Sequence, residues 1–157
     1  MSTQNTVMIV DDEPMVLTAL RSFLELETGY RVLTFITAQQ ALDALAEERV
    51  DVIVSDYMMP GMDGITFLCH AREARPLTTR ILLTGYADKE NAIRAINEAG
   101  LYHYLQKPWD NDHLKLVIRN GIERSQLFTE LDSRVAALED ANRELNGFRQ
   151  KLMQAFL

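Results

Sequence analysis

Short apolar runs alternate with longer amphipathic segments along the first two thirds of the chain. The runs are Val7–Val10, Tyr30–Phe35, Val50–Ser55, Arg80–Leu83 and Leu101–Leu105. They are brief and mostly apolar, which is typical of strands that are buried on both faces. We therefore expect five strands, each separated from the next by a segment long enough for a helix.

The segments between these runs carry helix signals. In the first of them, Pro14 suits the opening turn of a helix, where its missing N–H has no partner to lose, and Gly29 is a natural stop. The other helices are expected to open at Thr37, to span Ile65–Ala74, and to span Lys89–Ala99 with a stop at Gly100.

This alternation of strands and helices defines the fold class. Short connections and right-handed crossovers turn such a chain into a parallel sheet with helices on both faces. We predict an α/β, doubly wound, flavodoxin-like sheet of five parallel strands in the order 2-1-3-4-5. The ligand crevice of such a sheet lies beyond the carboxyl ends of its strands, where the strand order reverses. Here that point lies between the first and third strands.

The final segment predicts a helix that is too long for a globular domain. Residues 110–157 contain no proline, and leucine recurs every seven residues. Taking Leu131, Leu138, Leu145 and Leu152 as heptad d positions places Phe128, Val135, Asn142, Arg149 and Phe156 at a positions. We expect a globular domain over residues 1–122 and a coiled-coil linker helix over residues 123–157.

Residues at and beside this seam favour a parallel homodimer. Asn142 at an a position favours two parallel strands in one register. Arg134 at g would face Glu139 at e of the partner chain. Arg149 at a and Phe148 at g are imperfections in the pattern. A helix that folds back or frays is the alternative interpretation, and the sequence alone leaves it open.

Composition and charge argue against several classes of protein. The chain has 157 residues, a net charge of −7 and no basic block, so direct binding to nucleic acid or to an anionic membrane is not expected. Cys69 is the single cysteine and forms no intrachain disulfide, which fits a reducing compartment. Val7–Val10 is far too short for a signal peptide or a membrane span. We expect a cytoplasmic protein.

Five polar residues stand where the predicted strands end: Asp11, Asp12, Asp56, Thr84 and Lys107. Three close carboxylates repel one another, and Mg²⁺, which prefers oxygen ligands, would neutralise them. Asp56 could attack a phosphoryl donor to give an acyl phosphate, with Lys107 balancing charge and Thr84 donating its hydroxyl. Taken singly, each residue could be a helix cap, a turn residue or a solvated lysine, and their convergence is what favours chemistry.

Four motifs around these residues resemble one known family. They read VDDEP at the end of the first strand, SDYMMPGMDG at the third, LLTGYAD at the fourth and YLQKPW at the fifth. In this order they are similar to the receiver domain of two-component response regulators. The resemblance covers about residues 5–122.

The resemblance implies a phosphoacceptor beside a metal site. Asp56 would accept the phosphoryl group. Asp12 and Asp56 would bind Mg²⁺ directly, Asp11 would bind it through water, and the backbone carbonyl of Met58 would add a ligand.

The same resemblance implies residues that contact the phosphoryl group or report on it. Thr84 and Lys107 would contact the phosphoryl group, and Tyr104 matches the aromatic switch position, although it could be only a strand aromatic. The Lys107–Pro108 peptide is expected to be cis. Met58 and Tyr86 border the pocket and are expected to tune how fast the acyl phosphate hydrolyses.

The function implied is that of a phosphorelay switch. A sensor histidine kinase or phosphotransfer protein would present a phosphohistidine, and the receiver would catalyse its own phosphorylation and dephosphorylation. Thr84 would then move, Tyr104 would turn inward, and the dimeric helix would pass the change to an output domain beyond these residues. The output could be a cyclic-dinucleotide enzyme, a histidine kinase or a DNA-binding region. We expect no activity on an external substrate in these residues.

Two other classes of function were weighed. A metal-dependent phosphatase with an aspartyl nucleophile would carry an acidic residue two positions after Asp56, where this chain has Met58. A coiled-coil scaffold with an unphosphorylated receiver would not need the intact set of Asp56, Thr84 and Lys107. Turnover of a phosphate ester would favour the first class, and failure of Asp56 to accept phosphate would favour the second.

Overall fold

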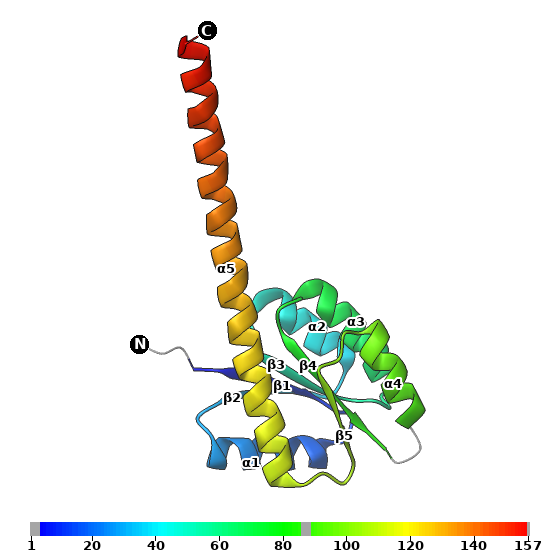
Figure 1. The fold of residues 1–157 in the computed structure, drawn as a ribbon. Coiled ribbons are helices and arrows are strands. Elements are labelled where there is room, and N and C mark those ends of the chain that lie inside the picture. The colour runs from blue at the N-terminus through cyan, green and yellow to red at the C-terminus, as the bar shows by residue number, and fades with distance from the viewer. Residues whose placement is uncertain (1–3, 86–88, 157) are drawn as a thin grey trace. The chain divides into compact units, whose positions relative to one another are not determined.

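A five-stranded parallel sheet forms the centre of the molecule. The computed structural model describes residues 4–85 and 89–156. Its strands are β1 (Thr6–Val10), β2 (Arg31–Phe35), β3 (Val52–Asp56), β4 (Thr79–Thr84) and β5 (His103–Gln106). They pair in parallel in the order β2-β1-β3-β4-β5 (Figure 1). The predicted fold class and strand order are confirmed.

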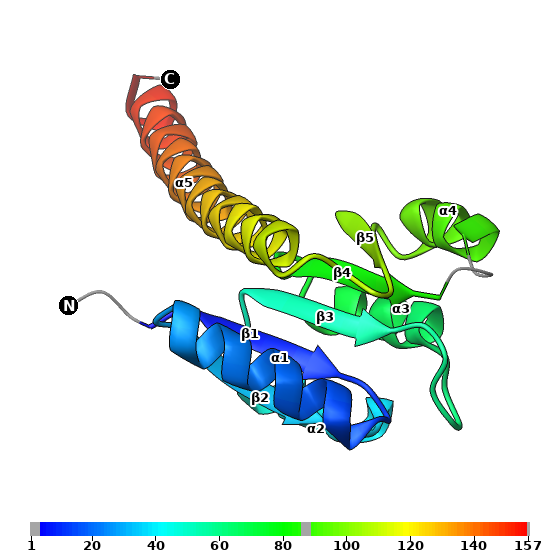
Figure 2. The same ribbon diagram turned by 90° about the horizontal axis from the view of Figure 1, so that it is seen from below.

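Helices cover both faces of this sheet. They are α1 (Pro14–Glu27), α2 (Ala38–Glu47), α3 (Gly64–Ala74), α4 (Lys89–Glu98) and α5 (Asn111–Phe156). Alternate strand residues point to opposite faces, so Val7 and Ile9 pack in the cluster with residues of α1 and α5, while Met8 and Val10 pack with those of α2 and α3. Figure 2 shows α1 on the near side of the sheet and α2 and α3 behind it.

Two site residues belong to strands rather than to the loops that follow them. Asp56 pairs with Leu83 in the β3–β4 ladder, and Thr84 pairs with Gln106 in the β4–β5 ladder. Backbone pairing with a neighbouring strand therefore carries both residues to the very edge of the sheet. At the other end, β5 begins at His103 and not at Leu101, and its ladder with β4 opens with the pair Ile81 and His103.

Helix α1 ends near Gly29, as predicted, but Gly29 is not what ends it. The helix ends at Glu27 with Thr28 as its C-cap, and both the N–H and the hydroxyl of Thr28 donate to the carbonyl of Leu24. Gly29 has no left-handed backbone angle. Gly100 after α4 does have one, with φ of 61°, as expected of a glycine that ends a helix.

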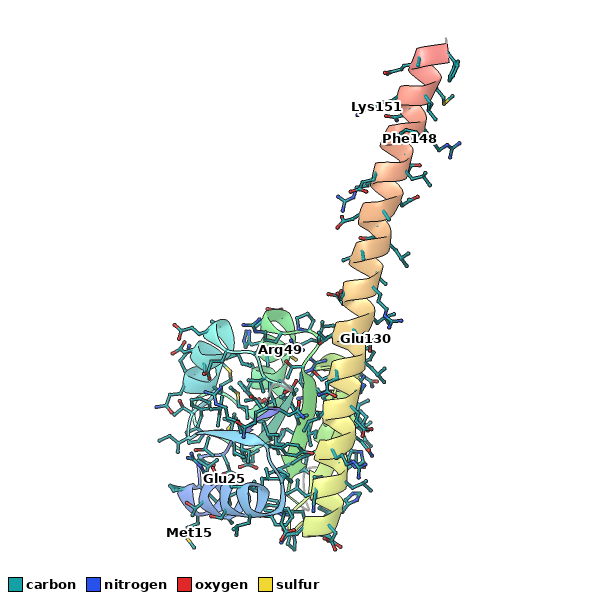
Figure 3. All side chains as sticks on the ribbon, turned by 90° about the vertical axis from the view of Figure 1, so that its left-hand side faces the viewer. Met15, Glu25, Arg49, Glu130, Phe148 and Lys151 are labelled. Carbon is teal, nitrogen blue, oxygen red and sulfur yellow. The ribbon has the colours of Figure 1, made fainter. Side chains whose placement is uncertain are left out.

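The chain divides into two compact units, residues 1–125 and 126–157. In the first unit, α5 buries Leu114, Val117, Ile118, Gly121, Ile122 and Ser125. In the second unit the apolar side chains of the helix are exposed, including that of Phe148 (Figure 3). No helix among the described residues is long and apolar enough to cross a membrane.

Candidate functional site

Parallel strands bring the site residues to one edge of the sheet. Asp11 and Asp12 follow β1, and Asp56 is the last residue of the adjacent strand β3. Thr84 ends β4, and Lys107 comes directly after β5. Because all the strands run in the same direction, these carboxyl ends meet at one edge, at the switch point of the strand order.

The three carboxylates lie close enough to share one cation. One oxygen of each of Asp11, Asp12 and Asp56 can be chosen so that all lie within 4.8 Å of one another. Asp11 is fully buried and Asp56 is 6% exposed, while Asp12 is more open to solvent. Hard carboxylate oxygens at this spacing fit a divalent cation such as Mg²⁺. The structure thus brings together the three acidic residues that the sequence singled out.

Lys107 lies between two of these carboxylates. Its Nζ is 3.0 Å from Oδ1 of Asp56 and 3.3 Å from Oδ2 of Asp11. Its backbone N–H donates to the carbonyl of Thr84 at 2.8 Å, which ties the end of β5 to the end of β4. The Lys107–Pro108 peptide is cis, as expected.

Burial dominates the electrostatics of the pocket. Desolvation raises the pKa of Asp11 and of Asp56 above that of an ordinary carboxyl group, although hydrogen bonds from Glu13 N–H and from Lys107 oppose the shift. For Lys107 burial favours the neutral form, but hydrogen bonding and attraction from Asp56 and Asp11 outweigh it and raise the pKa. The pocket therefore holds excess negative charge that is costly to bury, and a divalent cation would relieve it.

Thr84, Tyr104 and Met58 were also predicted as site residues, and none of them belongs to the carboxylate cluster. The buried hydroxyl of Thr84 donates to the carbonyl of Leu105 at 3.4 Å. Tyr104 is half-buried against the core cluster of α2 and α3. Met58 lies in the loop after β3 with its side chain 64% exposed. Tyr86 lies outside the described residues.

Gly64 supports the site in a way that sequence reasoning missed. It opens α3, and its N–H donates to the carbonyl of Tyr57 at 2.8 Å. A Cβ at this position would lie 2.1 Å from the backbone oxygen of Asp56, which no side chain allows. Glycine here lets α3 start directly against the backbone of Asp56. The glycine that ends PGMDG, directly before the expected helix Ile65–Ala74, was the available signal.

Comparisons with known proteins agree with this geometry. The family model for the response regulator receiver domain matches residues 7–119. The hydrogenase transcriptional regulatory protein HoxA of Cupriavidus necator is 44% identical over 124 residues, covering 79% of this chain and 25% of that protein. The C4-dicarboxylate transport transcriptional regulatory protein DctD of Pseudomonas aeruginosa is 36% identical over 145 residues, covering 92% and 30%. The chain spans less than a third of either relative.

Solved structures lead to the same family. The signal receiver domain of an HD domain-containing protein from Pseudomonas fluorescens Pf-5 is 36% identical and has a TM-score of 0.78. That match covers 83% of this chain and 95% of the solved one. With a family model matched over most of the chain and the acidic pocket at the switch point, the chain belongs to the receiver domains of two-component response regulators.

Proposed function

We propose that this chain is a phosphoacceptor switch in a phosphorelay and that Asp56 is the acceptor. A carboxylate oxygen of Asp56 attacks the phosphorus of a phosphohistidine on a sensor histidine kinase or phosphotransfer protein. The P–O bond of an acyl phosphate forms, the P–N bond breaks, and the imidazole leaves. Hydrolysis of the acyl phosphate by water returns Asp56 and phosphate.

Three side chains and one backbone carbonyl would hold the cation that this transfer needs. We assign Mg²⁺ to Asp11, Asp12, Asp56 and the carbonyl of Met58. When bound, Mg²⁺ would supply charge neutralisation at the phosphoryl oxygens. The convergence of the three carboxylates within 4.8 Å supports the assignment.

Two further side chains would act on the phosphoryl group itself. Lys107 already lies 3.0 Å from Asp56, so its ammonium is in place to balance the negative charge that develops on the transferred group. Thr84 would exchange its long hydrogen bond to Leu105 for one to a phosphoryl oxygen. That movement would leave room for Tyr104 to turn inward, and these two residues form the switch.

The observation that carries the proposal is the contact of Lys107 with two of the three clustered carboxylates. An acidic cluster alone would suggest a cation site. A partly buried ammonium beside the same carboxylates adds a second positive charge, which is what a transferred phosphoryl group requires and what a simple cation site would avoid.

We propose that the signal leaves through a parallel homodimer of the C-terminal helix toward an output domain. The relatives named above are longer proteins, two of them transcriptional regulators and one an HD domain-containing protein. They support a receiver joined to some output and do not favour one type. We place the protein in the cytoplasm, where a receiver meets its kinase.

The test is intact mass after incubation with acetyl phosphate. We expect a gain of one phosphoryl group that requires Mg²⁺, disappears with a chelator and is lost in Asp56→Asn. Asp63→Asn is the matched control, because it removes one negative charge from the same loop while an asparagine still caps α3 through Thr66 N–H. Labelling of Asp56→Asn at the rate of Asp63→Asn would refute the assignment.

A further inference from the structure

One side of α5 is buried in the first unit and exposed in the second. The heptad of the leucine seam, continued toward the N-terminus, places Leu114 and Gly121 at a and Val117 at d. All three are buried in the first unit, together with Ile118 and Ser125 at e and Ile122 at b. In the second unit seven of the nine a and d positions carry exposed apolar residues, and the other two are Asn142 and Arg149.

The large apolar residues that are exposed in the second unit are confined to one side of the helix. Seven of them lie at a or d and three at e or g, and none lies at b, c or f. They are Phe128, Leu131, Val135, Leu138, Leu145, Leu152 and Phe156, then Leu127, Phe148 and Met153. A seam this narrow fits a second helix of the same kind.

The flanking positions favour a second copy of this chain in parallel. In a parallel pair each g residue meets the e residue that lies five positions later in the partner. Arg134 would then meet Glu139 of a second copy, and Phe148 would meet Met153. One pair is of opposite charge and the other is apolar on both sides. Phe148, which looked like an imperfection, thereby gains an apolar partner.

The a and d positions of α5 form one stripe along the helix. Its buried part is hydrogen-bonded to the sheet at Gly121. The hydroxyl of Thr79, at the start of β4, donates to the carbonyl of Gly121 at 2.7 Å, and Thr79 is 1% exposed. A Cβ on Gly121 would lie 3.1 Å from a methyl of Thr79 and 3.2 Å from a methyl of Val52. A larger residue at this position would require Thr79 and Val52 to move by a few tenths of an ångström, so glycine favours this close approach.

The two stripe residues at the boundary are poor seam residues. Gly121 at a offers no side chain to a partner helix. Arg124 at d carries a charge, and its guanidinium lies 4.9 Å from the centre of the Tyr102 ring. These two positions are consecutive in the stripe, between Val117 and Phe128.

We propose that α5 offers one heptad stripe to two partners, its own sheet up to Ser125 and a second copy of this chain from Phe128. The hydrogen bond between Thr79 and Gly121 (the Thr79–Gly121 joint) and the charged Arg124 mark the point where the dimer seam ends and packing against the sheet begins. This inference rests on the dimer put forward under the proposed function.

Cysteine scanning at d positions tests where the seam ends. In a Cys69→Ser background, Leu131→Cys, Leu138→Cys and Arg124→Cys would each be treated with a short bismaleimide. We expect covalent dimers at 131 and 138, and dimers at 124 that form at least tenfold more slowly. Equal rates at all three positions would overturn the inference and leave the dimer standing. A monomeric sedimentation mass with no cross-link at any of the three positions would refute both the seam boundary and the dimer. Labelling of Asp56 would be unaffected by that result.

Variants of the joint test its role in ending the seam. Thr79→Val removes the hydroxyl at nearly constant shape, and Thr79→Ser keeps it. Gly121→Ala crowds the sheet, whereas Gly147→Ala is a matched control because a Cβ there meets nothing within 4 Å. In the Arg124→Cys background, Thr79→Val and Gly121→Ala should speed cross-linking severalfold, and Thr79→Ser and Gly147→Ala should not. Unchanged rates in both Thr79→Val and Gly121→Ala would show that the joint does not limit the seam.

Discussion

Lys107 is the residue that balances the charge of the acidic pocket. Asp11 is fully buried and Asp56 nearly so, and their nearest opposite charge is the Lys107 ammonium. Removing one partner of a buried charged group leaves the other without compensation, which is the expensive case.

Lys107→Ala should therefore destabilise the Mg²⁺-free protein by about 1–3 kcal/mol, measured by urea unfolding. The loss should shrink when Mg²⁺ is added, because the cation restores positive charge to the pocket. Lys115→Ala is the control, since Lys115 pairs with Glu27 at 3.7 Å on the exposed surface, and we expect a change below about 0.5 kcal/mol. Equal losses in the two variants, with no response to Mg²⁺, would contradict the assigned role of Lys107.

Affinity for Mg²⁺ should fall as the pH is lowered. Burial raises the pKa of Asp11 and Asp56, so they take up protons at a higher pH than ordinary carboxyl groups, whose pKa is about 4. Protonated carboxyls do not bind the cation, and the dissociation constant from calorimetry should rise well before that pH is reached. An affinity that stays constant down to about pH 5 would show that these groups are not its ligands.

The free energy of unfolding of the Mg²⁺-free protein should rise as the pH is lowered, whereas the affinity for Mg²⁺ falls. The folded state holds these two protons more tightly than the unfolded chain does, because the folded pKa is the higher one. Lowering the pH through the raised pKa values therefore adds stability from these groups, until the unfolded carboxyls are protonated too. Urea unfolding between neutral pH and about pH 5 measures the sign.

Residues of the pocket could be predicted from sequence, but a buried polar residue elsewhere in the fold could not. Asp11, Asp56 and Lys107 were predictable because each stands at a strand end, and strand order alone brings such ends together. Arg80 was interpreted as the first residue of a strand, yet its buried guanidinium donates to the carbonyls of Pro76, Thr78, Ala99 and Gly100. Desolvation lowers its pKa to about 10. These acceptors come from loops whose paths no local pattern encodes.

For the helices and strands, sequence patterns predicted their order along the chain more accurately than the residues at which they begin and end. The order follows from apolar runs and from crossover rules, which are local and general. The ends depend on particular hydrogen bonds, such as that from Tyr102 N–H to the carbonyl of Arg80, made before β5 begins. The close approach of α5 at Gly121 was missed for the same reason, although a glycine inside a helix often has a packing cause.

Charged residues in the seam of α5 should abolish the proposed dimer. Replacing Leu131, Leu138 and Leu145 by Lys places three charges at d positions, and the sedimentation mass should be that of a monomer. The control replaces Ser133, Ala137 and Glu144 by Lys, which lie at f and c positions outside the seam. Loss of dimer in both sets, or in neither, would argue against a coiled coil in this register.

In the molecule as a whole, strand β4 joins the edge of the sheet that carries the site to the long helix α5. Thr84 and Thr79 are the two ends of β4, so the strand that carries the switch hydroxyl also carries the contact with α5. Tyr104 lies on the neighbouring strand β5 and is paired with Leu82 of β4. Changes at Thr84 thus have a short covalent and hydrogen-bonded route to α5.

Tyr104→Ala should separate the chemistry from its transmission. Labelling with acetyl phosphate should be retained, because the Tyr104 ring packs against the core cluster of α2 and α3 and stacks on His103. In the parent protein we expect labelling to change hydrogen exchange along β5 and residues 111–125. Tyr104→Ala should lose that change. Asp56→Asn should lose both. Full exchange changes in Tyr104→Ala would exclude Tyr104 from the switch.

The central claim is that Asp56 itself carries the phosphoryl group, and the most direct measurement is to locate the modification. The protein would be labelled with acetyl phosphate and Mg²⁺, then reduced with borohydride, which converts an aspartyl phosphate to homoserine, and its peptides would be sequenced by mass spectrometry. The account predicts homoserine at position 56 and nowhere else. Homoserine at position 11 or 12, or a phosphate that resists reduction on a serine or threonine, would contradict it.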